Sequence, residues 1–279
     1  MKTSRGLTTA VALLAGAISL QGQEGLNLIR AGQTHPAAGV ATTQIKSVNR
    51  LLSGQGWETT IVLMDLGSTA VSFRQSFFGG NGAAASFNVN LPPNNTNLTT
   101  SALQGMIGPS GMVSFTLTGD GSSLQEGWSL LTYDGIPNQL SGYSVLRHKM
   151  AGGTVTFEAT FPFDNMMDSS ARMPFDNTRG FQTQLTIVNP ASNLSAQVQL
   201  TYINAQGQVT LLDSIGLKPG EQATLTLPNT YPDLANQAGT VAILANINCL
   251  SVSGLRLNPT SGSVAALPVM DFTAGVALQ

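Results

Sequence analysis

The chain has 279 residues, of which only 9% are charged, and a formal net charge of −2. Typical soluble domains carry about 25% charged residues, so the polar surface here has to come mainly from Ser, Thr, Asn, Gln and the 30 glycines. The 12 Lys and Arg residues do not cluster, which argues against electrostatic binding of nucleic acid.

The first 23 residues have the parts of a secretory signal peptide. Lys2 and Arg5 precede an apolar run over residues 7–20, and polar residues follow it. The run is shorter than the about 20 apolar residues that span a bilayer, so we expect an exported mature chain without a transmembrane segment. Residues 24–44 are small, polar and aperiodic, which predicts a flexible tether. The destination would be the periplasm or the extracellular space.

Two stretches with one alternating pattern indicate that the rest of the chain is a duplication. In residues 180–189 (GFQTQLTIVN), Phe181 and every second residue up to Ile187 point one way, with the period of a half-buried strand. Residues 56–65 (GWETTIVLMD) repeat this pattern. Later turns and strand starts match as well.

Each copy contains about seven short alternating strands separated by turn signals, which is the pattern of an antiparallel β-sandwich. We therefore predict an all-β protein, with a first sandwich over residues 45–165 and a second over residues 166–279. The first copy carries an insertion, residues 91–108, whose Pro, Asn and Thr content predicts a loop. Long loops on a rigid sandwich often bind ligands, although a tolerated surface insertion is the simpler alternative.

The order of these motifs resembles that of the tandem immunoglobulin-like (Ig-like) β-sandwich modules in secreted proteins of environmental, soil-type bacteria. The resemblance spans about residues 45–270, and its elements in the first copy are Gly56-Trp57-Glu58-Thr59, Phe77 to Gly82, Pro109 to Gly111, Gly127-Trp128 and Ser141-Gly142-Tyr143. The second copy matches the last of these with Ser253-Gly254-Leu255 and departs at Thr240, where a Trp is expected. The resemblance implies two tandem Ig-like sandwiches and export, without a particular activity.

An acidic repeat marks the junction of the two copies. The sequence PFDN occurs at residues 162–165 and again at residues 174–177. Asp164, Asp168 and Asp176 are therefore candidate ligands of a Ca²⁺ ion, because oxygen-rich clusters suit this cation. Their spacing is not that of an EF-hand loop, and repetition of strand ends explains the motif without a metal. No other cofactor is indicated.

Aromatic side chains are the candidates for sugar binding. Trp57 and Trp128 stand at strand starts, where packing in the core is the default expectation. Tyr133, Phe78 and Tyr231 are better candidates for an exposed face or a loop, and are the predicted ligand-binding residues.

The residue types of a catalytic site do not converge. His35 and His148 are the two histidines and Cys249 is the single cysteine, so neither a catalytic triad nor a zinc site is indicated. We expect a non-catalytic structural or adhesion-type module that contacts a protein or a polysaccharide at the cell surface. A carbohydrate-binding protein is the alternative, and an extracellular hydrolase with an unrecognised site is a third hypothesis.

Overall fold

A computed structural model describes residues 43–119, 121–150, 153–163, 169–260 and 263–271. The predicted signal peptide, most of the predicted tether, Asp164 and Asp168 lie outside these residues. The described chain is all-β, with four open antiparallel sheets. Within it, no helix is both long and apolar enough to cross a membrane.

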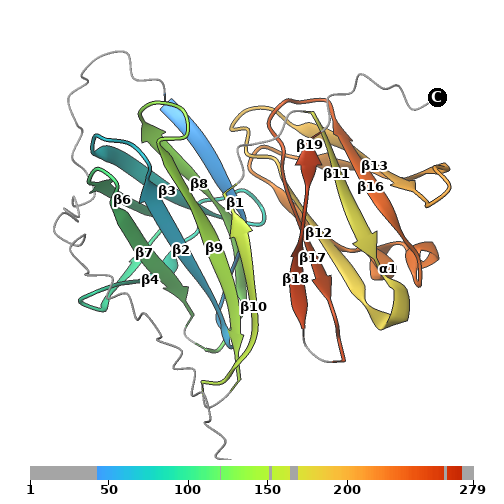
Figure 1. Cartoon of the computed structure of the whole chain (residues 1–279), viewed down its shortest axis with the longest axis horizontal. Helices are drawn as coiled ribbons and strands as arrows, with labels where there is room; N and C mark the ends of the chain where they lie inside the picture. The colour runs from blue at the N-terminus through green and yellow to red at the C-terminus, as the bar shows by residue number, and fades with distance from the viewer. Residues whose placement is uncertain (1–42, 120, 151–152, 164–168, 261–262, 272–279) are drawn as a thin grey trace, which may run out of the picture.

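The first half of the described chain, residues 43–163, contains two sheets (Figure 1). One has four strands in the order β1-β8-β3-β6, and the other has six in the order β10-β9-β2-β7-β4-β5. The strands are β1 (Thr43–Ser53), β2 (Trp57–Asp65), β3 (Val71–Gly79), β4 (Phe87–Leu91), β5 (Thr96–Thr100), β6 (Ala102–Ile107), β7 (Met112–Thr118), β8 (Gln125–Asp134), β9 (Leu140–Lys149) and β10 (Val155–Pro162).

The second half, residues 169–271, also contains two sheets, in the orders β14-β13-β16-β11-β19 and β15-β12-β17-β18. Its strands are β11 (Ser170–Asp176), β12 (Gln182–Val188), β13 (Ala196–Ile203), β14 (Val209–Leu217), β15 (Gln222–Thr226), β16 (Ala238–Ala245), β17 (Ser251–Leu257), β18 (Val264–Leu267) and β19 (Met270–Asp271). Three short helices connect them: η1 (Thr178–Gly180), α1 (Leu227–Thr230) and η2 (Pro232–Leu234).

The strand orders of the two halves correspond. The order β1-β8-β3-β6 matches β11-β16-β13-β14, and β10-β9-β2-β7 matches β18-β17-β12-β15. The first half adds the hairpin of β4 and β5, and the second half adds β19. The duplication predicted from the sequence is therefore also a duplication of topology.

One motif match from the sequence is shifted by two residues in the structure. Ser141 lies opposite Met64, and Ser251 lies opposite Val188. Because Met64 and Val188 occupy the same place in the repeated motif, the equivalent of Ser141 is Ser251 and not Ser253.

The predicted loop over residues 91–108 is wrong, because most of it is strand. Residues 96–100 form β5 and residues 102–107 form β6, which leaves only a short turn after Leu91. The β-branched threonines of TNLTT favour an extended backbone, and β5 pairs with β4 from Leu91↔Thr96 to Phe87↔Thr100. The composition of this segment indicated a loop. It forms a strand instead because β4, whose residues alternate between buried and exposed, pairs with β5.

Each half has its own hydrophobic core between its two sheets. In the first half, the ring of Phe77 from β3 meets those of Phe87 and Phe115 edge-on, with centroid distances of 5.7 and 6.4 Å. In the second half, Met173 from β11 and Ile243 from β16 are fully covered. The residues that alternate inward in the sequence therefore form these cores.

The threonine of the repeated motif joins two strands in each half. Thr59 Oγ1 donates a hydrogen bond to the carbonyl of Leu52 (2.8 Å) and accepts one from the Leu52 N–H (2.9 Å). Thr183 Oγ1 accepts one from the N–H of Asp176 (3.3 Å). These contacts satisfy buried polar groups within each sandwich. The recurrence of the threonine in both copies is therefore explained by its role in the fold.

A third hydrophobic cluster joins the two halves. Leu52, Leu146 and Phe157 of the first half pack with Leu255 of the second, and each is at most 7% exposed. Strands β10 and β18 lie side by side at this boundary (Figure 1). The halves therefore share buried apolar surface in addition to their separate cores.

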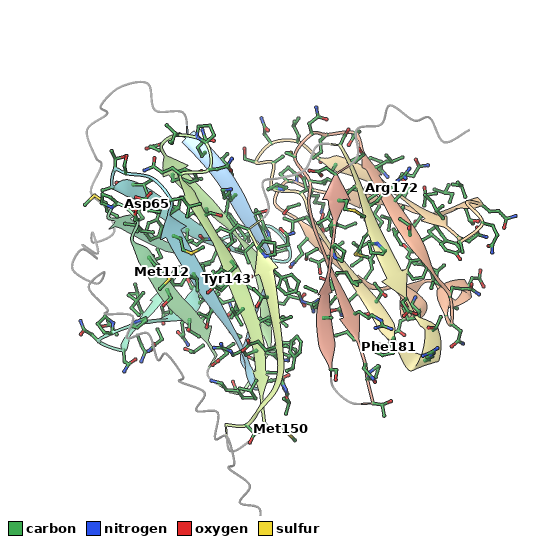
Figure 2. The ribbon with its side chains drawn as sticks, viewed as in Figure 1. Asp65, Met112, Tyr143, Met150, Arg172 and Phe181 are labelled. Carbon is green, nitrogen blue, oxygen red and sulfur yellow. The ribbon has the colours of Figure 1, made fainter. Side chains whose placement is uncertain are left out.

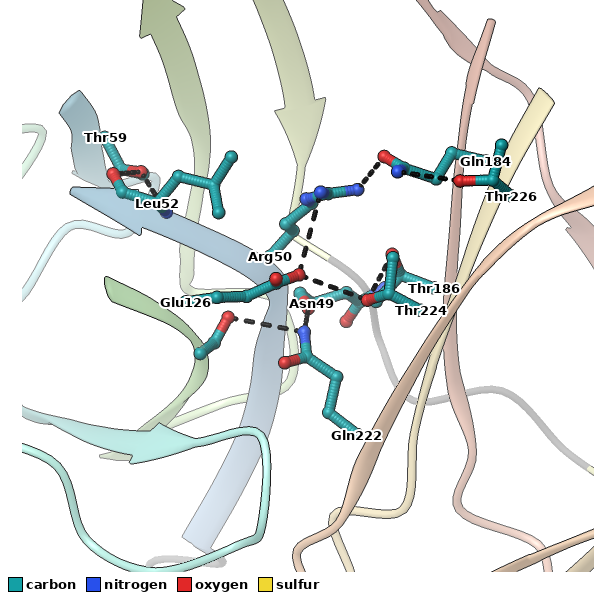
Figure 3. Close-up of polar contacts among 11 residues, drawn as sticks. Asn49, Arg50, Leu52, Thr59, Glu126, Gln184, Thr186, Gln222, Thr224 and Thr226 are labelled. Atoms are coloured by element: carbon teal, nitrogen blue, oxygen red, sulfur yellow. Dashed lines mark hydrogen bonds and ion pairs between the residues drawn. The ribbon is translucent and has the colours of Figure 1, made fainter. Parts of the chain in front are cut away.

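Polar contacts also cross the boundary between the two halves (Figure 3). The side-chain amide of Gln222 donates to the Asn49 carbonyl (2.7 Å). Arg50 is hydrogen-bonded to Gln184 across the boundary and lies 3.6 Å from Glu126 within its own half. Burial lowers the pKa of the Arg50 guanidinium below its ordinary value, and the nearby Glu126 carboxylate partly offsets this effect.

The backbones of the two halves also meet closely at two turns. Gly82 and Gly220 both have positive φ values, 81° and 75°. A Cβ on Gly82 would lie 2.7 Å from the Pro219 carbonyl oxygen, so only glycine fits this approach. Beside it, Trp128 Nε1 donates to the Gly220 carbonyl (2.8 Å). The sequence marked these glycines as turn formers, and the structure shows that they also allow the halves to touch.

The shared cluster predicts coupled unfolding. We expect Leu255→Ala, a change in the second half, to lower the free energy of unfolding by about 2–5 kcal/mol. Because Leu255 packs against the first half, the urea midpoint reported by Trp57 and Trp128 fluorescence should fall together with the midpoint from circular dichroism.

The matched control is Leu194→Ala, since Leu194 is 54% exposed in a loop and its truncation should change stability by no more than about 0.5 kcal/mol. A Leu255→Ala variant whose tryptophan midpoint stays at the wild-type value would show that the halves unfold independently.

Candidate binding surface

We call the side of the six-stranded sheet that faces away from the core the outer face. Its residues are exposed or half-buried, apart from Val62 and Val145, which are each 7% exposed. Directly opposed residues on neighbouring antiparallel strands point to the same side, so the register defines its members. They are Glu158, Thr160 and Pro162 of β10; Ser141, Tyr143, Val145 and Arg147 of β9; Glu58, Thr60, Val62 and Met64 of β2; Met112, Ser114, Thr116 and Thr118 of β7; Asn88 and Asn90 of β4; and Asn97 and Thr99 of β5.

Formal charges on the outer face lie in one row at its end and are paired. Arg147 stands opposite both Glu58 and Glu158. Arg147 Nε lies 2.5 Å from Glu158 Oε2, and Lys149 Nζ lies 2.7 Å from Glu58 Oε2. The two carboxylates are thus neutralised by neighbouring cations.

The next row carries no formal charge and is polar apart from Val145, which is 7% exposed. Thr60 and Thr116 are hydrogen-bonded through their hydroxyl groups (2.9 Å). Further along the same row, the Asn90 amide donates to Asn97 Oδ1 (3.0 Å). These side chains hold one another in place, and their remaining donors and acceptors point to solvent.

The remaining rows of the outer face are mainly apolar, with Ser114 and Ser141 among the apolar side chains. Tyr143 lies opposite Val62, and Met64 lies opposite Met112. Tyr143 is half-buried, and Met112 is 59% exposed. Figure 2 shows both of them on the side of the first half that faces the viewer. The outer face is therefore an apolar patch that continues into a neutral hydrogen-bonding row.

The equivalent face of the second half is covered. The Asp65 N–H donates to Gly111 and the Asn189 N–H donates to Glu221, both at 2.9 Å, which makes the next residues, Met112 and Gln222, equivalent. Gln222 contacts the first half, whereas Met112 is exposed. The repeated motif likewise aligns Thr60 with Gln184, which is bonded to Arg50, whereas the equivalent pair Val62 and Thr186 is buried in both halves, at 7% and 2% exposed. The two equivalent sheet faces thus differ at Met112 and Gln222 and at Thr60 and Gln184, where only the second half contacts the other half.

A shallow depression of about 700 Å³ adjoins the charged row. Its lining includes Trp57, whose ring centroid lies 4.8 Å from that of His148, together with Glu58, Lys149 and turn glycines. His148 Nδ1 is hydrogen-bonded to Thr156 Oγ1 (2.9 Å). Among the described residues of this lining, Glu58 is the one carboxylate, and it is paired with Lys149, so these residues alone do not supply the pair of carboxylates that glycoside hydrolysis uses.

The predicted exposed position of Tyr133 is wrong. Its side chain is 2% exposed and belongs to the first core. Tyr133 lies opposite Phe73 and follows Leu131 at the strand period of two, so both neighbours place it inward. A buried tyrosine is not available to an external ligand.

Phe78 and Tyr231 are half-buried and have partners. The ring of Phe78 stacks on Trp128 with a centroid distance of 4.4 Å and an interplanar angle of 17°. Trp128 is 1% exposed and contacts Gly220, so it packs at the boundary of the halves. Tyr231 packs against the second core and donates to Asp213 Oδ2 (3.2 Å). The structure does not bring Tyr133, Phe78 and Tyr231 together with one another.

Asp176 is engaged by its own half of the chain. It accepts hydrogen bonds from the Thr178 hydroxyl (2.6 Å) and N–H (2.9 Å), and it is paired with Arg256. The hydrogen bond from the Thr178 hydroxyl, aided by the charge of Arg256, holds the pKa of Asp176 below its usual range. Within the described residues, no group of three or more His, Cys, Asp and Glu side chains could hold a metal ion.

The sequence alone indicates only some of the residues of the outer face. The alternation in residues 56–65 shows which side chains of one strand point away from the core. It does not show that β7 and β4 lie beside β2, because sheet order depends on pairings that are distant in sequence. Tyr143 and Met112 were therefore missed as members of one surface.

No protein-family model, curated protein sequence or solved structure matches the chain. The function therefore has to be argued from the geometry.

Tyr231 provides a test of the local electrostatics. Burial, followed by the negative charge of Asp213, raises the pKa of Tyr231 to about 12. Because the pKa in the folded state exceeds the value in the unfolded chain, about 10, this contribution to stability is complete below pH 10. It is lost as the pH rises through 12.

We expect Asp213→Asn to lower the pKa of Tyr231 toward its ordinary value. The measurement is the tyrosinate absorbance, taken as a difference from Tyr231→Phe so that the other tyrosines cancel. A titration that does not change in Asp213→Asn would show that Asp213 has no part in the shift.

Proposed function

We propose that the chain is an exported, non-catalytic protein of two Ig-like β-sandwiches that acts as an adhesion-type module at the cell surface or outside the cell. It would bind its partner through the outer face of the first half. The low charge and the neutral polar surface support an extracellular role, and the signal-like sequence at residues 1–23 supports export.

The strand pairings support the Ig-like part of this proposal. An Ig sandwich pairs its second strand with its fifth and its third with its sixth. Leaving aside the added hairpin β4–β5, these pairs are β2–β7 and β3–β8, and the second half has β12–β15 and β13–β16. The first, fourth and seventh strands lie on the opposite sheets from those of a constant-type Ig domain, so the likeness is limited to the two pairs of inner strands.

One observation carries the binding role. The second half contacts the first half through its outer sheet face, whereas on the equivalent face of the first half Met112 is exposed and Tyr143 is half-buried. Exposed apolar side chains grouped on one face and bordered by polar residues are typical of interaction sites.

Two features favour binding over catalysis. Glu58 and Glu158 are each paired with a cation, so neither is poised as a general acid or base. Burial raises the pKa of the Cys249 thiol, which reduces the thiolate needed for nucleophilic attack.

The test is a depletion assay in which purified protein is incubated with washed cells of its source and the unbound fraction is measured. We expect Met112→Glu to weaken cell binding by about tenfold or more, because it places a charge within the apolar part of the outer face. The matched control is Leu211→Glu on β14, since Leu211 is also 59% exposed.

Equal binding of the two variants, or a wild-type protein that stays in solution, would contradict the proposal. The assay should be repeated with a calcium chelator. Loss of binding on chelation in both variants would indicate that adhesion depends on calcium. Asp164, Asp168 and Asp176 would then be the candidate ligands of the ion.

A further inference from the structure

We infer that the outer face binds a neutral polysaccharide chain, laid across β9, β2, β7 and the hairpin β4–β5. This inference rests on the proposed function, because it names the ligand class of the same face. It is carried by the charge, the hydrogen-bonding groups, the apolar patch and the width of that face.

The hydrogen-bonding groups match sugar hydroxyls. The Thr60–Thr116 pair uses one of its two hydroxyl protons internally and retains one O–H donor and acceptor lone pairs, while Asn90 and Asn97 each retain an N–H donor and an acceptor oxygen. A sugar hydroxyl also donates and accepts, and it can therefore pair with any of them. The cations near this row are already paired with carboxylates, so an anionic polymer would find no free positive charge among them.

The apolar patch suits the carbon–hydrogen faces of sugar rings. Tyr143 stands next to Val62 in the register, and its ring combines an apolar body with a hydroxyl group at the tip. Met112 and Met64 lie beside them and can adjust to an irregular surface. A ring packed on Tyr143 would leave its hydroxyls free to reach the row of Thr60.

The added hairpin widens the face in the half that keeps it open. Val89 of β4 is fully buried and anchors the hairpin to the core, while Asn88 and Thr99 are exposed and joined by a hydrogen bond of 2.6 Å. The second half builds the same sandwich without such a hairpin. The hairpin is therefore not needed for the shared fold, and it extends the polar rows by two strands.

The shape favours a polymer over a small molecule. With strands about 4.8 Å apart, the six strands span roughly 24 Å. This surface is open along its length, whereas pockets for small molecules are concave and enclose most of the ligand.

The contacts that the second half makes through its own outer sheet face are not repeated on the outer face of the first half. Gln222 reaches the Asn49 carbonyl, and Gln184 contacts Arg50. The equivalent residues of the outer face are Met112 and Thr60, which are too short or too apolar for these contacts. The groups that bind protein in one copy are thus replaced in the other.

The experiment is native affinity electrophoresis of the whole protein in gels that contain a soluble neutral polysaccharide, such as hydroxyethylcellulose, xyloglucan or mannan. Alginate serves as the anionic comparison. We expect at least one neutral polymer to retard the protein and alginate to have no effect. Tyr143→Ala and the double variant Thr60→Val/Thr116→Val should each raise the apparent Kd by about tenfold or more.

The control is Thr210→Val, an exposed threonine of β14 that should leave retardation unchanged. Circular dichroism confirms that each variant is folded. Retardation by no neutral polymer, or equal retardation of all variants, would overturn the inference.

Two further outcomes identify another occupant and also overturn it. If cells are bound through Met112 but no neutral polysaccharide binds, the adhesion proposal survives with a protein partner. If sedimentation shows self-association that Tyr143→Ala abolishes, the occupant is a second copy of the chain.

Discussion

The structure depends on the contact that buries the second half's outer sheet face against the first half. Leu255 inserts among apolar side chains of β1, β9 and β10, and Gln222 satisfies a main-chain carbonyl beside them. Burial of the Arg50 guanidinium at this contact costs free energy, because burial disfavours its charged form. Its hydrogen bond to Gln184 and its proximity to Glu126 offset that cost.

This contact makes two related halves unequal. Both contain the same sheet orders, so each could in principle present the same face to solvent. One copy uses that face to hold the molecule together, with glutamine and threonine side chains that reach across the boundary. The other copy keeps it free and carries methionine, valine and tyrosine there. Duplication followed by such divergence separates a structural surface from a candidate binding surface within one chain.

Local patterns in the sequence predicted the repeated strands, the turn glycines and the duplication. Period-two alternation correctly placed Leu63 and Leu185 in the cores. Alternation could not show what covers the opposite side of a strand. Thr186 has a polar side chain on that side and is nonetheless only 2% exposed.

The errors have different origins. Tyr133 was expected on a surface, although its period-two spacing from Leu131 indicates the buried side of its strand. The segment after Leu91 was expected to be a loop because its partner strand, β4, was not recognised. Trp128 was correctly expected to be buried, but its position between the halves depends on long-range contacts. The outer face required the order of strands in the sheet, which local sequence does not encode.

Hydroxyl-radical footprinting of the whole protein, read by mass spectrometry, tests the central claim most directly. The claim is that one sheet face is covered and its equivalent is open. The account predicts rapid oxidation of Met112 and Tyr143 and strong protection of Trp128 and Leu255. Oxidation of Trp128 and Leu255 at rates expected for exposed side chains would contradict it, because the second half's face would then be open as well.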